Sequence, residues 1–180
     1  MKSNIKIVDN FLDNKTFKKL NKDVIEQTKE RWSYSDFLNF LSDKEDYQFV
    51  CMLVNNNDIT FNQARDLLYP VMNKIKYDFF EGQSLVVSRA KLNFFGMFKK
   101  NKGMGMHTDL INEHHYYTAI YYLNSNNGGT QIEDGEFIQS KENRLLLFKG
   151  QVRHESVVQT DTTTRLLFNI NFYKEEQFKW

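Results

Sequence analysis

The second half of the chain alternates short apolar runs with turn residues, a pattern typical of β-rich domains. From residue 84 onward, β-branched and aromatic runs predict strands at 85–95, 104–109, 116–123, 130–132, 136–139, 144–148, 154–158 and 164–173. Glycine, asparagine and aspartate in segments such as 124–129 and 133–135 provide the turns between them. Several short strands at this spacing favour a β-sandwich or a jelly roll.

The first half carries apolar residues at helical spacing instead. A short strand is expected at 5–8, and Asp13 is placed to cap a helix that follows it. One face of that helix carries Phe17, Leu20, Val24 and Ile25. Residues 31–58 show no clear period apart from a strand expected near 49–54.

A second helix is predicted after residue 60. Thr60 and Gln63 form a capping-box pair, and Ile59 is placed to pack against Ala64 as a hydrophobic staple. Apolar residues continue one face of this helix as far as residue 75. Pro70 is expected to kink the helix or to end it early, because proline cannot donate the helical hydrogen bond.

Together these elements define the expected fold class. No internal repeat or proline-rich linker divides the 180 residues, which suit one domain. We therefore expect a single α+β, mainly β domain over 1–180, with a helical support region at 1–83 and a β core at 84–175. The helices should pack on one outer face of the jelly roll.

Composition narrows the cellular context. The net charge is +1, from 24 basic and 23 acidic residues, which argues against nucleic-acid binding through bulk electrostatics and leaves a local basic patch open. The single cysteine, Cys51, excludes an intrachain disulfide and fits a reducing compartment. We recognise no signal peptide and no apolar run near the roughly 20 residues that a membrane span needs. A cytoplasmic protein without a membrane partner is expected.

The most informative motif is His107-Thr108-Asp109, which is followed far downstream by His154. Two imidazoles and one carboxylate form the ligand set that holds non-haem Fe(II) on one face and leaves the opposite positions open. In a strand, the side chains of residues 107 and 109 would share one face. Arg165 lies eleven residues after His154, where it could bind a dicarboxylate co-substrate.

Zinc is the rival metal, because it accepts the same ligand types. A zinc hydrolase would need a separate general base, and no glutamate stands beside these ligands as it does in a His-Glu-x-x-His helix. Arg165 would also have no evident role there. Iron is therefore favoured, and a jelly roll that keeps a metal only for structure stays open as a non-enzymatic alternative.

Segment 85–173 resembles the 2-oxoglutarate- and Fe(II)-dependent dioxygenases, especially their prolyl 4-hydroxylase-like branch with its small bacterial and phage members. The resemblance rests on His107-x-Asp109, Ile-Tyr-Tyr-Leu-Asn at 120–124, Gly128-Gly129, Asn-Arg-Leu-Leu-Leu-Phe at 143–148, His154, Arg165 and Asn-Phe-Tyr at 171–173. The opening segment 7–12 is similar to that branch more loosely. The implied fold is a double-stranded β-helix supported by N-terminal helices.

The resemblance also implies site roles. His107, Asp109 and His154 would bind iron as the catalytic metal ligands. Arg165 would pair with the C5 carboxylate of 2-oxoglutarate, for which a guanidinium has the matching geometry, and the Tyr122 hydroxyl would reach the same group.

Three asparagines are further candidates near the co-substrate. Asn93 lies on a strand where family members often place a polar or aromatic group close to it. Asn171 and Asn169 alternate inward with Arg165, and a buried amide needs hydrogen-bond partners. Either the co-substrate or a neighbouring strand end could supply those partners.

The implied reaction is hydroxylation of an unactivated C–H bond with consumption of O2 and release of succinate and CO2, with ascorbate as an accessory. A prolyl or other amino-acid side chain, in a small molecule, peptide or protein, is the substrate class of that branch. A nucleic-acid-directed demethylase or hydroxylase is the alternative enzyme, and it predicts a continuous basic face. The metal-only module leaves Arg165 and Tyr122 without a role.

Several other polar residues are weighed as substrate contacts. His114 and His115 follow the ligand pair in a segment that is best interpreted as a solvated loop. Lys99, Lys100 and Lys102 form a basic turn that could close over an acidic substrate, although a solvated turn is the simpler interpretation. Arg153 is the stronger candidate, because it adjoins His154.

Overall fold

A computed structural model describes residues 5–35, 47–110 and 115–177 of the chain. In chain order, the elements are β1 (Lys6–Val8), α1 (Asn14–Thr28), β2 (Ser33–Ser35), β3 (Gln48–Asn55), β4 (Asp58–Ile59), α2 (Ala64–Phe80), β5 (Leu85–Gly96), β6 (Tyr117–Tyr122), β7 (Gly129–Ile132), β8 (Phe137–Gln139), β9 (Arg144–Lys149), β10 (His154–Val157), β11 (Thr164–Lys174) and the 3-10 helix η1 (Glu175–Gln177). Seven of the eight strands predicted after residue 84 are confirmed, with ends that agree within one residue.

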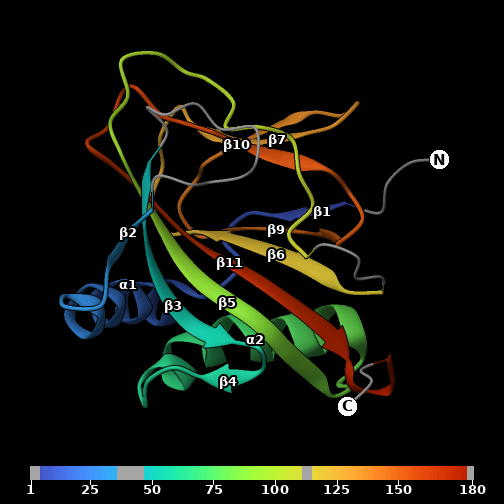
Figure 1. The fold of residues 1–180 in the computed structure, drawn as a ribbon. Coiled ribbons are helices and arrows are strands. Elements are labelled where there is room, and N and C mark those ends of the chain that lie inside the picture. The colour runs from blue at the N-terminus through green and yellow to red at the C-terminus, as the bar shows by residue number, and fades with distance from the viewer. Residues whose placement is uncertain (1–4, 36–46, 111–114, 178–180) are drawn as a thin grey trace.

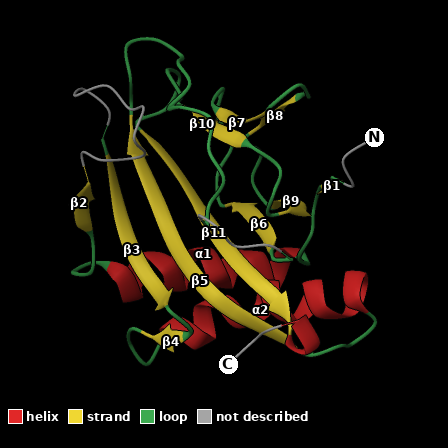
Figure 2. Ribbon diagram, turned by 45° about the vertical axis from the view of Figure 1, so that its right-hand side comes forward, coloured by secondary structure: helices red, strands yellow, loops and turns green. Residues whose placement is uncertain are grey.

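The strands form two antiparallel sheets. The large sheet has the order β1-β9-β6-β11-β5-β3-β2, with β4 paired to β3, and the small sheet has the order β10-β7-β8. Helices α1 and α2 cover one face of the large sheet, and the small sheet lies across the other face (Figures 1 and 2). This arrangement confirms the mainly β jelly roll with its helices on one outer face. The first 83 residues contribute strands β1 to β4 to the large sheet as well as both helices.

The two faces of the large sheet bury two separate hydrophobic clusters. Leu20, Val24, Leu67, Val71, Ile75, Leu92, Phe168 and Ile170 belong to the cluster under the helices. Phe95, Ile120, Ile132, Ile138, Leu146 and Leu167 belong to the cluster that includes residues of both sheets. Because successive side chains of a strand point to opposite faces, β11 sends Phe168 and Ile170 toward the helices. Its alternate residues, from Arg165 to Asn171, therefore face the space between the sheets.

Helix α1 begins as the sequence predicts. The Asp13 carboxylate accepts hydrogen bonds from the backbone N–H groups of Lys15 and Thr16, both at 3.0 Å. Phe17, Leu20 and Val24 are buried against the sheet. The placement of Ile25 on this face was wrong, because its side chain is 62% exposed. None of the helices in the described part of the chain is long and apolar enough to cross a membrane.

Helix α2 differs from its prediction at the cap and at the proline. The N-cap residue is Gln63, which makes no side-chain capping bond. The Thr60 hydroxyl instead donates to the backbone carbonyls of Met52 and Leu53, so the predicted capping box does not form. Pro70 does not end the helix, which continues to residue 80. Buried apolar residues on both sides of the proline hold the two parts on the sheet despite the missing hydrogen bond.

The predicted strand at 104–109 is the one that does not form. Only isolated bridges occur in this region, from Gly103 to Val157 and from His107 to His154. Gly105 has a φ of +92°, which interrupts extended backbone between the two bridges. The ligand motif therefore lies on an irregular segment beside β10 rather than on a regular strand.

Asn143 ties the segment before α1 to the sheet. Its side-chain oxygen accepts from the Leu12 N–H at 2.9 Å and from the Tyr121 hydroxyl at 2.7 Å, and its side-chain nitrogen donates to the Leu12 carbonyl. We expect Asn143→Ala to lower the free energy of unfolding by about 3 kcal/mol, because it leaves several buried groups unpaired. Urea denaturation measures this change. Tyr121→Phe removes only one of these bonds and should cost about 1 kcal/mol; equal losses would contradict the role of Asn143.

Candidate metal centre

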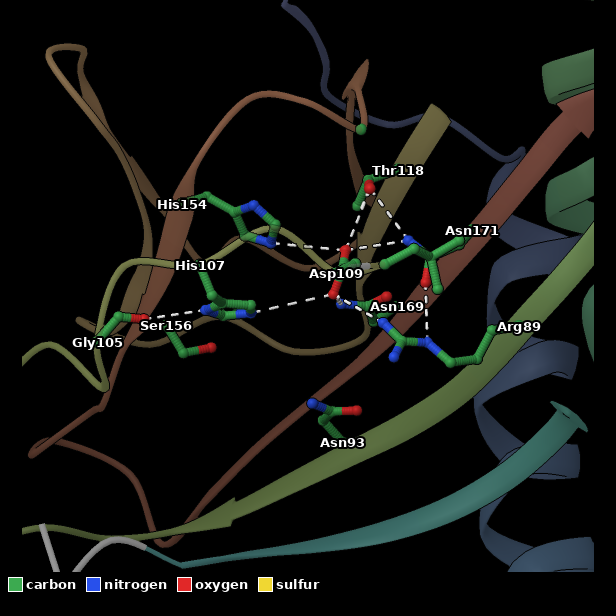
Figure 3. A network of polar contacts seen from close by, with 12 residues as sticks. Arg89, Asn93, Gly105, His107, Asp109, Thr118, His154, Ser156, Asn169 and Asn171 are labelled. Atoms are coloured by element: carbon green, nitrogen blue, oxygen red, sulfur yellow. Dashed lines mark hydrogen bonds and ion pairs between the residues drawn. The ribbon is translucent and has the colours of Figure 1, made fainter. Parts of the chain in front are cut away.

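The three residues of the ligand motif meet in space. A backbone bridge joins His107 to His154 through two N–H···O=C bonds of 2.9 Å, so the two imidazoles lie side by side with ring centroids 4.9 Å apart. Asp109 follows in a bend and turns its carboxylate toward both rings (Figure 3). One ligand atom from each of the three residues lies within 4.8 Å of the others. These side chains are therefore close enough to share one cation.

Backbone carbonyls fix the protonation of both imidazoles. Nδ1 of His107 lies 2.9 Å from the Gly105 carbonyl oxygen, and Nδ1 of His154 lies 3.1 Å from that of Val152. Because a carbonyl oxygen can only accept, each Nδ1 carries a proton, which leaves Nε2 as the nitrogen that can bind a metal. The Nε2 atoms lie 4.0 Å and 3.6 Å from the Asp109 carboxylate oxygens. Both nitrogens are thus oriented as metal ligands.

The charge state of the cluster suits a divalent cation. Burial lowers the pKa of His154, which keeps its imidazole neutral. Burial by itself would raise the pKa of Asp109, but the positive charges around it, with Arg89 among them, hold that pKa far below its usual range. The cluster therefore offers a neutral imidazole at position 154 and a permanent carboxylate, as a metal ligand set requires.

Four donors from three strands hold the Asp109 carboxylate in place. Oδ1 accepts from Arg89 at 3.0 Å and from Asn169 at 3.1 Å. Oδ2 accepts from Thr118 at 3.1 Å and from Asn171 at 3.0 Å. Sequence reasoning missed Arg89 and Thr118, which lie on the strands predicted at 85–95 and 116–123.

Asn171 has no free polar atom for a co-substrate. Its amide nitrogen donates to Asp109 and Thr118, and its oxygen accepts from Nε of Arg89 at 3.0 Å. Asn171 thus orients the Asp109 carboxylate, and each of its polar atoms already has a partner other than the predicted co-substrate.

Arg165 and Tyr122 lie together on the inner face of the large sheet. Arg165 is 0% exposed, and its guanidinium donates to the Ser140 and Ser156 hydroxyls and, at 2.8 Å, to the Gly129 carbonyl. Its central carbon lies 5.9 Å from the Tyr122 ring centroid. Burial lowers the pKa of Arg165 to about 10, so the side chain stays charged at neutral pH. Among the described residues no carboxylate pairs with this buried cation, which is costly without a counter-ion.

A small cavity of about 40 Å³ lies between the sheets and extends from the two histidines to the side chains that contact Arg165 and Tyr122. Both histidines line it, and so does the predicted residue Asn93, whose amide nitrogen donates to Gln48 at 2.9 Å. Thr130 and Ser156 also line it, and these two contact the Tyr122 hydroxyl and Arg165 respectively. A larger surface hollow of about 310 Å³ beside Phe80 and Lys149 contains none of the cluster.

This chain has solved structures similar to it in fold, but no known protein family matches it in sequence. No family model and no curated protein matches the chain. A 2OG-Fe(II) oxygenase family oxidoreductase from Burkholderia pseudomallei superposes with a TM-score of 0.69 at 11% identity, over 95% of this chain and 85% of that one. A prolyl-4-hydroxylase from Pseudomonas putida gives 0.67 at 14% identity, over 97% and 94% of the two chains. The chain has the fold of the 2OG-Fe(II) oxygenases.

A third structure with this oxygenase fold is a prolyl hydroxylase from Trichoplax adhaerens in complex with a hypoxia inducible factor peptide fragment. It superposes with a TM-score of 0.67 at 16% identity, over 97% of this chain and 86% of that one. This shared fold confirms the jelly-roll architecture that the strand pattern and the family resemblance predicted.

The other polar residues considered in the sequence lie outside the His107, Asp109 and His154 cluster wherever the structure describes them. His115 is exposed, and His114 falls outside the described residues. Lys99 and Lys100 are exposed as well. Arg153 forms an ion pair with Glu133 at the surface and donates to a backbone carbonyl. None of these described side chains enters the cluster of His107, Asp109 and His154.

The support given to Asp109 can be tested by metal binding. We expect Asn171→Ala to weaken Mn(II) binding about 10- to 100-fold, because ligands that lose an orienting hydrogen bond bind metal less well. A titration followed by electron paramagnetic resonance measures the free ion. Asn93→Ala is the matched control, since Asn93 contacts Gln48 and not Asp109. Equal affinities in the two variants would contradict the orienting role.

Proposed function

We propose that this protein is a 2-oxoglutarate-dependent Fe(II) dioxygenase that hydroxylates an unactivated C–H bond. One atom of O2 enters the hydroxyl group, and the other enters succinate as 2-oxoglutarate loses CO2. The observation that carries this proposal is the pairing of a His-Asp-His cluster with a buried guanidinium that has no carboxylate partner among the described residues. One cavity reaches the two histidines of the cluster and Ser156, whose hydroxyl accepts a hydrogen bond from this guanidinium.

The donor set fits ferrous iron. His107, Asp109 and His154 would hold the ion on one side through two imidazole nitrogens and one carboxylate oxygen. When bound, the ion would supply the activation of O2, which no amino-acid side chain provides. The four donors on Asp109 keep that ligand in one orientation before the ion arrives.

Arg165 supports 2-oxoglutarate as the co-substrate. A guanidinium binds a carboxylate in a bidentate manner, and the Arg165 bonds to Ser140 and Ser156 are long, at 3.2 and 3.3 Å. A carboxylate can replace such weak neutral partners. The Tyr122 hydroxyl, now 2.7 Å from the Thr130 hydroxyl, would add a second contact. Because the cavity holds only about 40 Å³, the Thr130 and Ser156 side chains must rotate as the co-substrate enters.

The chain's own share of the reaction is positioning and the exclusion of water. Phe95, Ile120 and Leu167 line the cavity with apolar surface next to the two histidines. Such a wall keeps bulk water from the reacting centre. An amino-acid side chain such as proline is the proposed substrate class, supported by two prolyl hydroxylases among the similar structures. The proposed reaction would use ascorbate as an accessory reductant, and the proposed location of the protein is the cytoplasm.

A metal-only module accounts less well for this site. Such a module has no use for a charged side chain that is wholly buried, and Arg165 is buried beside the cavity without a described counter-ion. Uncompensated charge in a protein interior costs stability, so its presence favours a ligand that neutralises it.

The proposal is tested by succinate formation from 2-oxoglutarate with Fe(II) and ascorbate, without any primary substrate. The wild-type protein should show slow turnover that His107→Ala lacks. His115→Ala is the matched control, because His115 is exposed and outside the cluster. If the iron-loaded wild-type protein formed no succinate above the His107→Ala level, the proposed activity would be refuted.

A further inference from the structure

The cavity is lined by a lysine to which the proposed reaction assigns no role. Lys91 lies on β5 and lines the same cavity as His107 and His154. On that strand Arg89 binds Asp109 and Asn93 binds Gln48. Lys91 lies between them, and it makes no hydrogen bond or ion pair with any residue in the described ranges.

No acidic group near the cavity forms an ion pair or a hydrogen bond with Lys91 in the described part of the chain. Both oxygens of Asp109 already accept two hydrogen bonds each. The Glu155 carboxylate turns to the segment around Gly105, whose N–H donates to it at 2.9 Å. Burial lowers the pKa of Lys91 to about 8, with Arg89 lowering it further and Asp109 opposing the change, so the ammonium is mostly charged at neutral pH. The cavity thus holds a cation that acts on Asp109 from a distance but forms no ion pair with any described residue.

Two orphaned amide oxygens lie in the same cavity wall. The side-chain oxygens of Asn93 and Asn169 are buried and have no hydrogen-bond partner among the described residues. The orientation of Asn169 is fixed, because its amide nitrogen donates to the Asp109 carboxylate. Buried carbonyl oxygens normally accept a hydrogen bond, so these two atoms require a donor. One ammonium and two acceptors therefore face the cavity.

We propose that the primary substrate is a free α-amino acid. Its carboxylate would bind Lys91, and its ammonium would donate to Asn93 and Asn169. This inference rests on the proposed function and names the substrate of the same site. A residue inside a peptide carries an amide in place of the carboxylate, and it would leave the Lys91 charge unpaired.

The first test compares each of the twenty free amino acids with its carboxamide. Succinate formation is measured with the Fe(II)-loaded wild-type protein and 2-oxoglutarate, and products are checked by mass spectrometry for one added oxygen atom. At least one amino acid should raise succinate formation above the unstimulated rate. Its carboxamide should be about 10- to 100-fold less effective, because it lacks the charge that pairs with Lys91.

The second test changes the lysine. Lys91→Met should lower the ratio of stimulated to unstimulated turnover at least tenfold at a subsaturating concentration of the active amino acid. Lys91→Arg keeps the charge and should recover part of that loss. Lys18→Met is the control, because Lys18 is exposed on α1, across the large sheet from the small one.

Binding separates this inference from the proposed function. Calorimetry with the Mn(II)-loaded protein and the same amino acids needs no turnover. Lys91-dependent binding without succinate formation would refute the oxygenase and leave the amino-acid site standing. Three results would overturn the site while the oxygenase stands: no amino acid binds or stimulates, the carboxamide works equally well, or Lys91→Met raises the requirement for 2-oxoglutarate instead.

Discussion

Replacing Asp109 with asparagine is expected to lower 2-oxoglutarate turnover about 1000-fold or more and to abolish tight Fe(II) binding. The substitution keeps the size of the side chain but removes the one anionic ligand of the proposed iron site. It also turns one acceptor into a donor. That new amide nitrogen would face two of the four groups that now donate to the carboxylate, so the side chain can no longer hold its orientation.

Turnover and metal binding must fall together in Asp109→Asn. Succinate formation reports the first, and a Mn(II) titration reports the second without any chemistry. Thr108→Ala is the matched control, because Thr108 lies between the two ligands in sequence but not in the cluster. A folded Asp109→Asn protein, shown by circular dichroism, that still turned over at a tenth of the wild-type rate would exclude Asp109 as a ligand.

The ligand motif was predictable, but the geometry that joins it was not. His107 and Asp109 were expected to share the face of a strand, yet that strand does not form. The bridge between His107 and His154 brings the ligands together instead, and it depends on the course of β10. Residue types therefore indicated the candidate ligands, whereas the backbone arrangement that joins them needed the tertiary structure.

The support around the site was missed because it depends on strand register. Arg89, Asn171 and Thr118 are direct neighbours across β5, β11 and β6. Asn171 was singled out as a polar residue on a buried strand, but Arg89 and Thr118 look unremarkable in their own segments. A shift by one residue would turn any of the three to the helical face. Only the pairing of three distant strands shows that they converge on Asp109.

Local signals were reliable where no tertiary partner competed with them. Asp13 is exposed and caps α1 as predicted. Thr60 carries an equally plausible capping signal, but its hydroxyl lies within reach of carbonyl groups on β3 and binds them instead. Hydrophobic alternation, which is averaged over many residues, located seven strands that no single signal could have placed.

The second large effect concerns the buried guanidinium. Arg165→Met is expected to remove most of the stabilisation that 2-oxoglutarate gives to the metal-loaded protein. A ligand at 100 times its dissociation constant stabilises a protein by about 2.7 kcal/mol. Loss of a buried charged contact costs about 2–5 kcal/mol of binding, which raises the dissociation constant roughly 30- to 5000-fold. At the same concentration of 2-oxoglutarate, the variant should therefore show little or no shift in thermal unfolding.

The same variant should still bind Mn(II), because the Arg165 hydrogen bonds go to Ser140, Ser156 and Gly129 and to none of the three ligands. If Mn(II) binding survives while the response to 2-oxoglutarate disappears, the metal ligands and the co-substrate contact act independently. Arg65→Met, an exposed arginine on α2, controls for loss of one positive charge. If Arg165→Met and Arg65→Met responded equally to 2-oxoglutarate, the buried guanidinium would need another ligand. If Arg165→Met also weakened Mn(II) binding, the Arg165 charge would act on the His107, Asp109 and His154 cluster itself.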